Sequence, residues 1–364
     1  MSATTCMALA ATLMPAAPGP AASSGCVGFG AEVAGRFSQR LPTGGVDRAF
    51  SLSRSRFELG LDREGAGARL VLAGVRSGGP DSYVGVAGES IVPQFQVAEA
   101  RYRAASLALT VAAGLVDDPW VTSANASWDL RATGPGVGEA QGWLDRSDLG
   151  GAAAWTSRDR WLSVAATATT GEGLERRERN NGQDTAGLVT VRPLAGRDDR
   201  AELMELQLYG REGSRGLGAA RDHRAGARLT HRSPWVAGGI EWLQSWGVQG
   251  DAMRTPRALS GWAQLTPPTL PTLAWIRLDH VDEQPGTPDT RAIRSSAGLG
   301  LGLPTNSEGS PPIRMVLGWD RETRDAAVAT LSGAMSTTRA DAIFIQLDLR
   351  AREAVQTFPA DLDR

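Results

Sequence analysis

Apolar and polar residues alternate with a period of two along most of the chain from residue 27 onward. In AIFIQLDLRA, residues 342–351, the isoleucines and leucines fall on one face, while Gln346, Asp348 and Arg350 fall on the other. The pattern recurs most clearly at 27–37, 107–115 and 313–320. Because successive side chains of a strand point to opposite faces of a sheet, this period predicts β-strands rather than helices.

The alternating runs define sixteen predicted strands. They span 27–37, 51–62, 67–76, 94–103, 106–116, 148–156, 161–169, 185–193, 201–211, 223–232, 235–245, 258–266, 271–280, 291–302, 312–320 and 341–352. Most are long for a soluble sandwich, and the polar faces carry Arg, Asp or Gln. Local alternation alone does not distinguish a strand that faces lipid from one that covers a protein core.

The connections distinguish the two, because their lengths alternate along the chain. The second is REGA at 63–66 and the fourth has two residues, 104–105, whereas the fifth spans 117–147. Seven short connections, of which 194–200 and 303–311 are only moderately short, interleave with eight long ones. This predicts an all-β, closed antiparallel transmembrane β-barrel of about 16 strands, with short periplasmic turns and long outer loops.

Composition narrows the class further. The formal net charge of −2 argues against a nucleic-acid partner, which usually requires a basic domain. No stretch approaches the ~20 consecutive apolar residues of a membrane helix. The three histidines lack metal-ligand spacing, and no nucleophile elbow, P-loop or dinucleotide fingerprint occurs. We therefore expect no enzyme, no cofactor and no metal site.

The two ends of the chain are expected to differ from the barrel. Residues 1–25 contain a short apolar run followed by Pro, Ala and Ser, which predicts a signal peptide and export through the periplasm to the bacterial outer membrane. A lipoprotein signal is one alternative, because Ser23-Ser24-Gly25-Cys26 resembles a lipobox, and the absence of any signal is the other, because no basic residue precedes Arg36. The barrel is assigned to 26–352 and a polar C-terminal tail to 353–364.

Several segments resemble the phosphate-selective porin O and P family. In residues 148–194 two strands are followed by an Asn/Gly-rich loop, NNGQ, and by a strand that ends in VRPL, similar to the Arg-x-Pro-Leu strand end of that family. RSRFELGLDREGAGARLVLAG is similar to an early strand pair of that family, and RLDHVD at 277–282 to its Arg-x-Asp-x-x-Asp strand. The resemblance spans most of the chain after residue 40. It implies an outer-membrane porin, with a homotrimer as the expected assembly and outer-membrane lipids, the barrel-assembly machinery and small solutes or anions as partners.

Two features depart from that family. Its members use lysines as well as arginines in the pore, whereas all 38 basic residues of this chain are arginine. Phosphate selectivity is therefore not carried over. Outer-membrane barrels also tend to end on an aromatic residue, whereas here the polar AVQTFPADLDR follows the last predicted strand and places Phe358 six residues from the end.

If the more apolar parity of each strand faces lipid, most strand charges face the lumen. The expected pore-lining residues are Glu32, Arg36, Arg54, Arg56, Glu58, Arg69, Arg192, Arg211, Arg224, Arg228, Arg277, Asp279, Arg294, Arg314, Asp348 and Arg350, with Arg232 and Asp320 on the same parity. Arginine predominates in this set, and rings of arginine favour anions. A mild anion preference is one hypothesis. The alternative is that the arginines pair with lumen carboxylates and water and confer no preference.

The connection at 117–147 is too long for a simple link, and such loops are usually functional. As the third outer loop it is expected to enter the barrel and narrow it, although an external cap is the alternative. The expected constriction residues are Trp120, Trp128, Arg131, Glu139, Trp143 and Asp145. Other tryptophans are expected in an interfacial girdle at headgroup depth, namely Trp155, Trp161, Trp235, Trp242, Trp275 and Trp319.

The function favoured by these patterns is a water-filled channel for passive diffusion of small solutes. One alternative is a soluble all-β binding protein such as a propeller, which should repeat every ~40–50 residues. No such repeat is found in the sequence. The other alternative is an outer-membrane barrel plugged by its loops, with a structural or adhesive role, and the sequence alone does not separate it from a channel.

Overall fold

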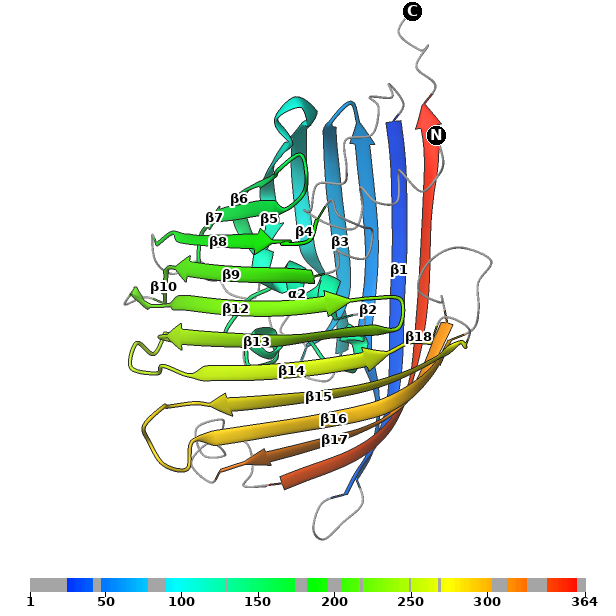
Figure 1. The fold of residues 1–364 in the computed structure, drawn as a ribbon, viewed down its shortest axis with the longest axis vertical. Helices are drawn as coiled ribbons and strands as arrows, with labels where there is room; N and C mark the ends of the chain where they lie inside the picture. The colour runs from blue at the N-terminus through cyan, green and yellow to red at the C-terminus, as the bar shows by residue number, and fades with distance from the viewer. Residues whose placement is uncertain are drawn as a thin grey trace, which may run out of the picture.

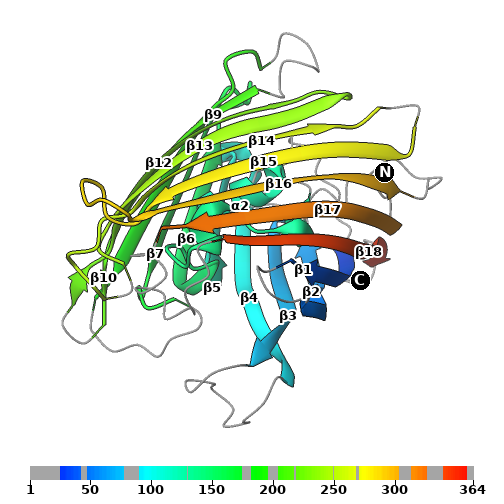
Figure 2. The same ribbon diagram turned by 90° about the horizontal axis from the view of Figure 1, so that it is seen from below.

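The computed structural model describes residues 25–41, 47–77, 90–128, 130–173, 182–195, 204–216, 219–248, 250–267, 270–302, 313–325 and 339–358. Sixteen strands of this described chain form one closed antiparallel barrel (Figures 1 and 2). The predicted fold class and strand number are confirmed. The predicted signal peptide lies outside the described residues, except for its last residue.

The barrel strands follow one another along the chain and around the wall. They are β1 (Gly25–Arg40), β2 (Asp47–Arg63), β3 (Ala66–Ser77), β4 (Ser90–Ala104), β5 (Leu109–Asp117), β6 (Ser147–Thr156), β7 (Leu162–Thr169), β8 (Asp184–Val191), β9 (Met204–Glu212), β12 (His223–Arg232), β13 (Val236–Trp246), β14 (Arg257–Leu265), β15 (Thr272–Asp282), β16 (Arg291–Gly302), β17 (Ile313–Arg324) and β18 (Arg339–Phe358). The pairing of β1 with β18 closes the ring.

The remaining elements are short. A separate hairpin, β10 (Ser214–Arg215) with β11 (Ala220–Arg221), was not predicted. The helical segments are η1 (Ala105–Leu107), α2 (Pro119–Ser127), η2 (Arg131–Thr133) and α3 (Val137–Ala140). Among the helices described, none is long and apolar enough to cross a membrane.

Strand β18 extends further than the sequence pattern predicted. It ends at Phe358, and its final residues pair with the start of β1, as Gln356 does with Cys26. Residues 353–358, which were expected to begin a polar tail, therefore belong to the last strand.

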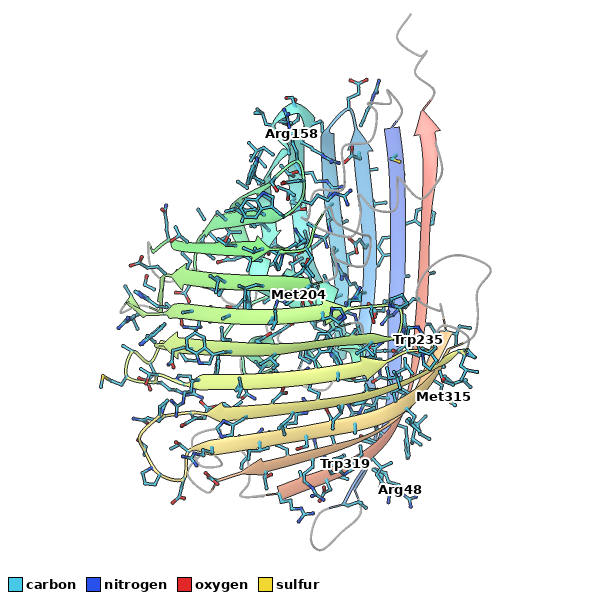
Figure 3. All side chains as sticks on the ribbon, viewed as in Figure 1. Arg48, Arg158, Met204, Trp235, Met315 and Trp319 are labelled. Carbon is cyan, nitrogen blue, oxygen red and sulfur yellow. The ribbon has the colours of Figure 1, made fainter. Side chains whose placement is uncertain are left out.

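Side chains alternate across the wall as the period of two requires. In β18, Ile345 is 50% exposed on the outer face, whereas Gln346 and Asp348 are at most 1% exposed on the inner face. Met315 of β17 stands on the outer face as well and is 50% exposed (Figure 3). The outer surface is therefore apolar and the inner surface polar over these strands.

The wall has an uneven height. Strands β1, β2 and β18 contain 16, 17 and 20 residues, whereas β7 and β8 contain eight each. Figure 1 shows the long strands together on one side of the barrel and β6–β9 on the other.

Candidate functional site: a loop held inside the barrel

The connection between β5 and β6 folds against the inner wall, beginning with helix α2. Asp118 caps this helix, because its Oδ1 accepts hydrogen bonds from the backbone N–H groups of Trp120 (2.9 Å) and Val121 (3.1 Å). Pro119 occupies the first helical position, where a missing N–H is tolerated. Tyr209 of β9 donates its hydroxyl proton to Asp118 Oδ2 across 2.8 Å. Burial raises the pKa of the Asp118 carboxyl.

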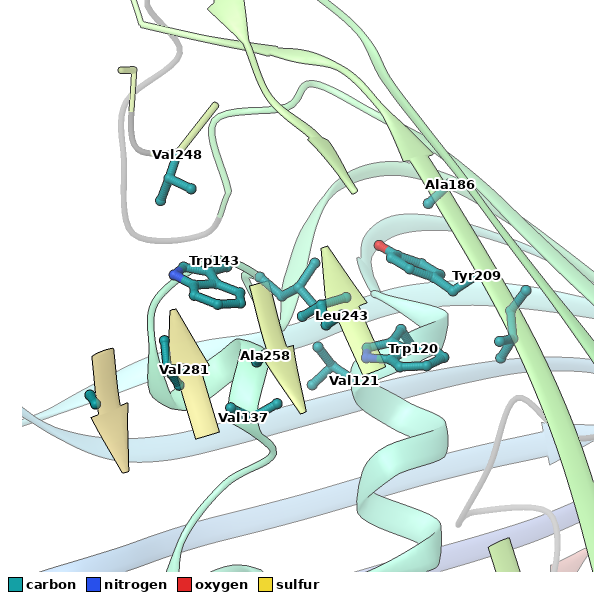
Figure 4. Packing of buried hydrophobic residues seen from close by; sticks show 13 residues of the cluster. Trp120, Val121, Val137, Trp143, Ala186, Tyr209, Leu243, Val248, Ala258 and Val281 are labelled. Carbon is teal, nitrogen blue, oxygen red and sulfur yellow. The ribbon is translucent and has the colours of Figure 1, made fainter. Parts of the chain in front are cut away.

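Trp120 connects this helix to the wall by ring contacts. Its side chain is 1% exposed and stacks on Tyr209, with ring centroids 5.3 Å apart (Figure 4). On β12, the guanidinium carbon of Arg228 lies 3.8 Å from the centre of the Trp120 ring. Arg228 also donates to Ser123 Oγ of the helix and pairs with Glu241 of β13, each at 2.8 Å. The helix therefore contacts β9 and β12 directly, and Arg228 links it to β13.

Two apolar patches on the inner wall receive the loop. The first packs around α2 and α3 (Figure 4) and includes Trp120, Val121, Val137, Trp143 and Leu144 of the loop with Leu188, Tyr209 and Leu243 of the wall. The second includes Trp128 and Leu130 of the loop with Leu273, Trp275, Val316 and Phe344 of the wall. The three loop tryptophans are at most 5% exposed. They are buried in these packing contacts and have little surface left to line an aqueous path.

The prediction that Trp275 belongs to an outer girdle is wrong. Trp275 faces inward and is 5% exposed, because it shares its strand face with the inward Arg277. Its ring centroid lies 6.0 Å from that of Trp128, which also lies 5.3 Å from the ring of Trp262. Four of the other girdle tryptophans are 38–53% exposed, namely Trp155, Trp161, Trp235 and Trp242. On the remaining one, Trp319, Arg321 lies 5.0 Å from the ring centre.

Besides Arg36 and Arg228, whose bonds to the carbonyls of Thr133 and Trp120 are longer (3.5 and 3.4 Å), three arginines of the wall donate hydrogen bonds to backbone carbonyls of the loop. They are Arg224, Arg232 and Arg277, and their acceptors are Trp143 (2.9 Å), Ala126 (2.7 Å) and Pro135 (2.7 Å). Arg224 and Arg277 are at most 6% exposed. Together with Arg228, these side chains were expected to face the pore, and in the structure they contact the loop.

A basic cluster forms where the loop meets the first strands. We define it as Arg54 and Arg56 of β2, Arg69 of β3, and Arg131 and Arg146 of the loop. Its carboxylate partners are Glu32 to Arg54 (2.6 Å), Glu58 to Arg56 (3.2 Å) and Arg69 (2.8 Å), Asp117 to Arg69 (2.8 Å) and Arg146 (3.7 Å), and Glu139 to Arg131 (2.6 Å). The cluster therefore contains nearly as many carboxylates as guanidinium groups.

The two loop arginines of this cluster, Arg131 and Arg146, both have lowered pKa values. Burial and the charge of Arg146 lower the pKa of Arg131 well below its ordinary value, and burial also lowers the pKa of Arg146. The Nη1 of Arg131 is a buried donor that has no acceptor among the described residues. A buried donor of this kind is normally satisfied by water or by an anion.

The other expected site residues pair along the inner wall, except Asp145 of the loop, which pairs with the separate hairpin. The pairs are Arg36 with Asp320 (2.7 Å), Arg192 with Glu205 (2.8 Å), Arg211 with Asp184, Asp279 with Arg277 (2.9 Å), Arg294 with Asp320 (3.2 Å), Asp348 with Gln346 (2.7 Å), Arg350 with Glu32 (3.3 Å) and Asp145 with Arg215 of the hairpin. Arg314 is 4% exposed. Most of the inner charges are thus compensated within the wall.

Sequence reasoning missed several residues of the site. Asp117, Asp118, Arg146 and Tyr209 were not proposed, although all four contact the loop or hold its ends. The Asp-Pro pair at 118–119 was an available signal, because Asp at the cap and Pro at the first position are a helix start. Within the described chain, no group of three or more His, Cys, Asp or Glu side chains could hold a metal ion.

Comparison with known proteins relates the fold to outer-membrane porins. No family model and no curated protein matches the sequence. Among solved structures, an anion-selective porin from Comamonas acidovorans is 10% identical, with a TM-score of 0.63 over 90% of this chain and 100% of its own. OprB of Pseudomonas putida is 9% identical, with a TM-score of 0.60 over 89% of this chain and 94% of its own. The channel DcaP of Acinetobacter baumannii is 7% identical, with a TM-score of 0.60 over 92% of this chain and 100% of its own. This chain therefore has the sixteen-stranded barrel fold of those porins.

Proposed function

We propose that this protein is a porin of the bacterial outer membrane, through which small solutes diffuse passively. The observation that carries the proposal is the loop between β5 and β6, which is attached to the inner wall at two apolar patches and by arginine hydrogen bonds. A loop fixed in this way narrows the barrel without moving, while the charged inner wall keeps the remaining space wet. The outer surface supports the membrane location, because large apolar side chains are exposed on most strands.

We further propose a mild preference for anions. The basic cluster lies where the loop narrows the barrel, and the pKa of Arg131 is lowered there by burial and, to a lesser extent, by the neighbouring positive charge of Arg146. Guanidinium groups lower the electrostatic barrier for anions. The preference is mild because the cluster has nearly matching carboxylates. Selectivity for phosphate is not part of the proposal, since the chain has no lysine.

The partners of such a porin are the outer-membrane lipids, its permeating solutes and the barrel-assembly machinery. We propose a homotrimer as the assembly, supported by an outer-membrane protein of Vibrio cholerae solved in a trimer form, with which this chain shares the fold at a TM-score of 0.59 and 10% identity. A cleaved signal peptide at 1–25 is the proposed route of export.

Single-channel recording in planar bilayers tests the proposal. Insertion of the purified protein should give stepwise conductance, and a salt gradient should give a reversal potential that favours chloride over potassium. An inserted barrel without conductance would contradict the channel and support the plugged, structural barrel. Recovery of the protein as a soluble periplasmic species without detergent would contradict the membrane location.

A further inference from the structure

The outer face of the barrel carries a hollow at the long-loop end of β8, β9, β12 and β13. Its volume is about 590 Å³. Gly187 and Gly210 line it and lie opposite each other in the pairing of β8 with β9. A Cβ atom added to either glycine would meet no atom within 4 Å. The two glycines therefore leave open a space that larger side chains occupy elsewhere on the outer wall.

The position of the hollow along the membrane normal follows from the outward-facing residues around it. Towards the short turns, the outward positions are apolar, with Leu208 52% and Trp242 41% exposed. At the level of the hollow the outward positions become polar, with Thr185, Glu212 and His223. The hollow thus lies at the edge of the apolar band, where lipid headgroups are found. The orientation of the proposed porin places this edge in the outer leaflet, and the inference rests on that orientation.

The lining offers one uncompensated cation. The guanidinium carbon of Arg221 lies 5.8 Å from the ring centre of Trp246, and no carboxylate of the described chain forms an ion pair with it. Arg211 and Arg224 border the hollow too, but each is already paired with an aspartate. Glu212 is the one carboxylate among the lining residues.

Backbone contacts fix Arg221 next to Trp246. Gly247 follows Trp246 with a φ of +83°, and a Cβ atom there would lie 1.6 Å from the carbonyl oxygen of Arg221. Arg224 Nη1 donates to the carbonyl oxygens of both His223 and Gly247, at 2.8 Å each. The segment that carries Arg221 and His223 is therefore held against the end of β13, so the site is organised before any ligand arrives.

We propose that this hollow binds a phosphate group of a phosphorylated lipid headgroup in the outer leaflet. The guanidinium of Arg221 can hold two phosphate oxygens as a fork, and the imidazole of His223 and the indole N–H of Trp246 supply further donors. The glycines leave room for the headgroup, and the acyl chains lie on the apolar surface around Val189 and Leu208. Basic pockets at membrane interfaces bind phosphorylated headgroups by the same chemistry.

Native mass spectrometry of the detergent-purified, full-length protein tests the proposal. The probes are diphosphoryl lipid A, its dephosphorylated form and inorganic phosphate. The diphosphoryl form should bind most tightly, and Arg221→Gln should weaken it by about ten- to a hundredfold, as expected for lost charge-assisted hydrogen bonds. Gly210→Leu should weaken it as well, because leucine fills the hollow and leaves the charge in place. Glu212→Gln should strengthen it, because it removes a repelling carboxylate.

The matched control is Arg257→Gln, because Arg257 is an exposed arginine at the same end of the barrel and is already paired with Asp282. It should leave lipid binding unchanged. Equal weakening by both arginine variants would overturn the proposal in favour of a general surface charge. Arg221-dependent binding of inorganic phosphate as tight as that of the lipid would overturn it in favour of a free-anion site. Channel conductance should not change in Arg221→Gln, so failure of the channel and failure of this site are separate results.

Discussion

Tyr209 on the barrel wall donates a hydrogen bond across 2.8 Å to Oδ2 of Asp118, whose other carboxylate oxygen caps helix α2. One carboxylate therefore performs two tasks, since it starts the helix and fixes its end to β9. Because the same helix carries Trp120 into the first apolar patch, the position of the whole loop depends on this end.

Replacing Asp118 by Asn should strengthen docking of the loop at neutral pH. Asn keeps an oxygen acceptor for the helix cap, its NH2 group takes the place of Oδ2 and donates to the Tyr209 hydroxyl, and the substitution removes a charge that burial disfavours. Because the pKa of Asp118 is raised in the docked loop, the docked state gains stability as the carboxyl takes up a proton and loses it as pH rises through that pKa. The advantage of Asn over Asp should therefore be present at pH 7 and vanish near pH 4. Limited proteolysis of the loop at the two pH values measures it, and an Asn advantage that grows towards acid pH would contradict the assignment.

Trp120→Ala should release the helix from the wall. Replacing a buried tryptophan by alanine typically costs about 3–5 kcal/mol. Here this loss should weaken docking of the loop against the inner wall. We expect a larger and noisier single-channel conductance with the barrel still assembled on gels. Trp242→Ala is the control, because that tryptophan is 41% exposed on the outer face. An unchanged conductance in Trp120→Ala would show that the loop does not limit the channel.

Replacing Arg54 and Arg56 together by Gln should weaken the preference for anions. Both side chains belong to the basic cluster and pair with Glu32 and Glu58, so their removal leaves excess negative charge beside the loop. The reversal potential in a salt gradient should shift towards potassium. Arg257→Gln serves here as an outward-facing control and should leave the reversal potential unchanged. A shift towards chloride would contradict the proposal that the basic cluster favours anions where the loop narrows the barrel.

A charge on the lipid face should destabilise the barrel according to depth. Leu317 lies near the middle of β17 and is 51% exposed, so Leu317→Arg should cost about 2–4 kcal/mol. Thr272 is exposed at the first position of β15, and Thr272→Arg should cost about 0–1 kcal/mol. Urea unfolding in lipid vesicles measures both. Equal costs at the two depths would show that these positions do not face a membrane.

The strand pattern was readable from the sequence because it is repeated and physically simple. The bounds 223–232 and 291–302 of β12 and β16 agree with the prediction, and the outward isoleucines of β18 lie on the predicted face. The extent of β18 was not predicted, because polar residues in 353–358 look like a tail until their pairing with β1 is known.

The loop contacts were harder to predict, although their signal is present. Leu243, Trp275, Val316 and Phe344 are apolar residues on the polar face of their strands, next to inward residues such as Gln346. Alternation alone treats them as exceptions, whereas the structure shows that they receive the loop. Which strands the loop crosses is a long-range property that no local period encodes.

The uneven wall has a consequence for the surrounding bilayer. A tilted transmembrane strand needs about 9–11 residues to cross the hydrocarbon, so β7 and β8, with eight residues each, fall short, while β1, β2 and β18 exceed this length. The lipid beside the short strands has to thin or the barrel has to lean, and either response costs elastic energy. The bilayer is therefore deformed on one side of the barrel and not on the other. Because neighbouring membrane proteins meet a different bilayer thickness on each side, the barrel is expected to face them in a preferred orientation.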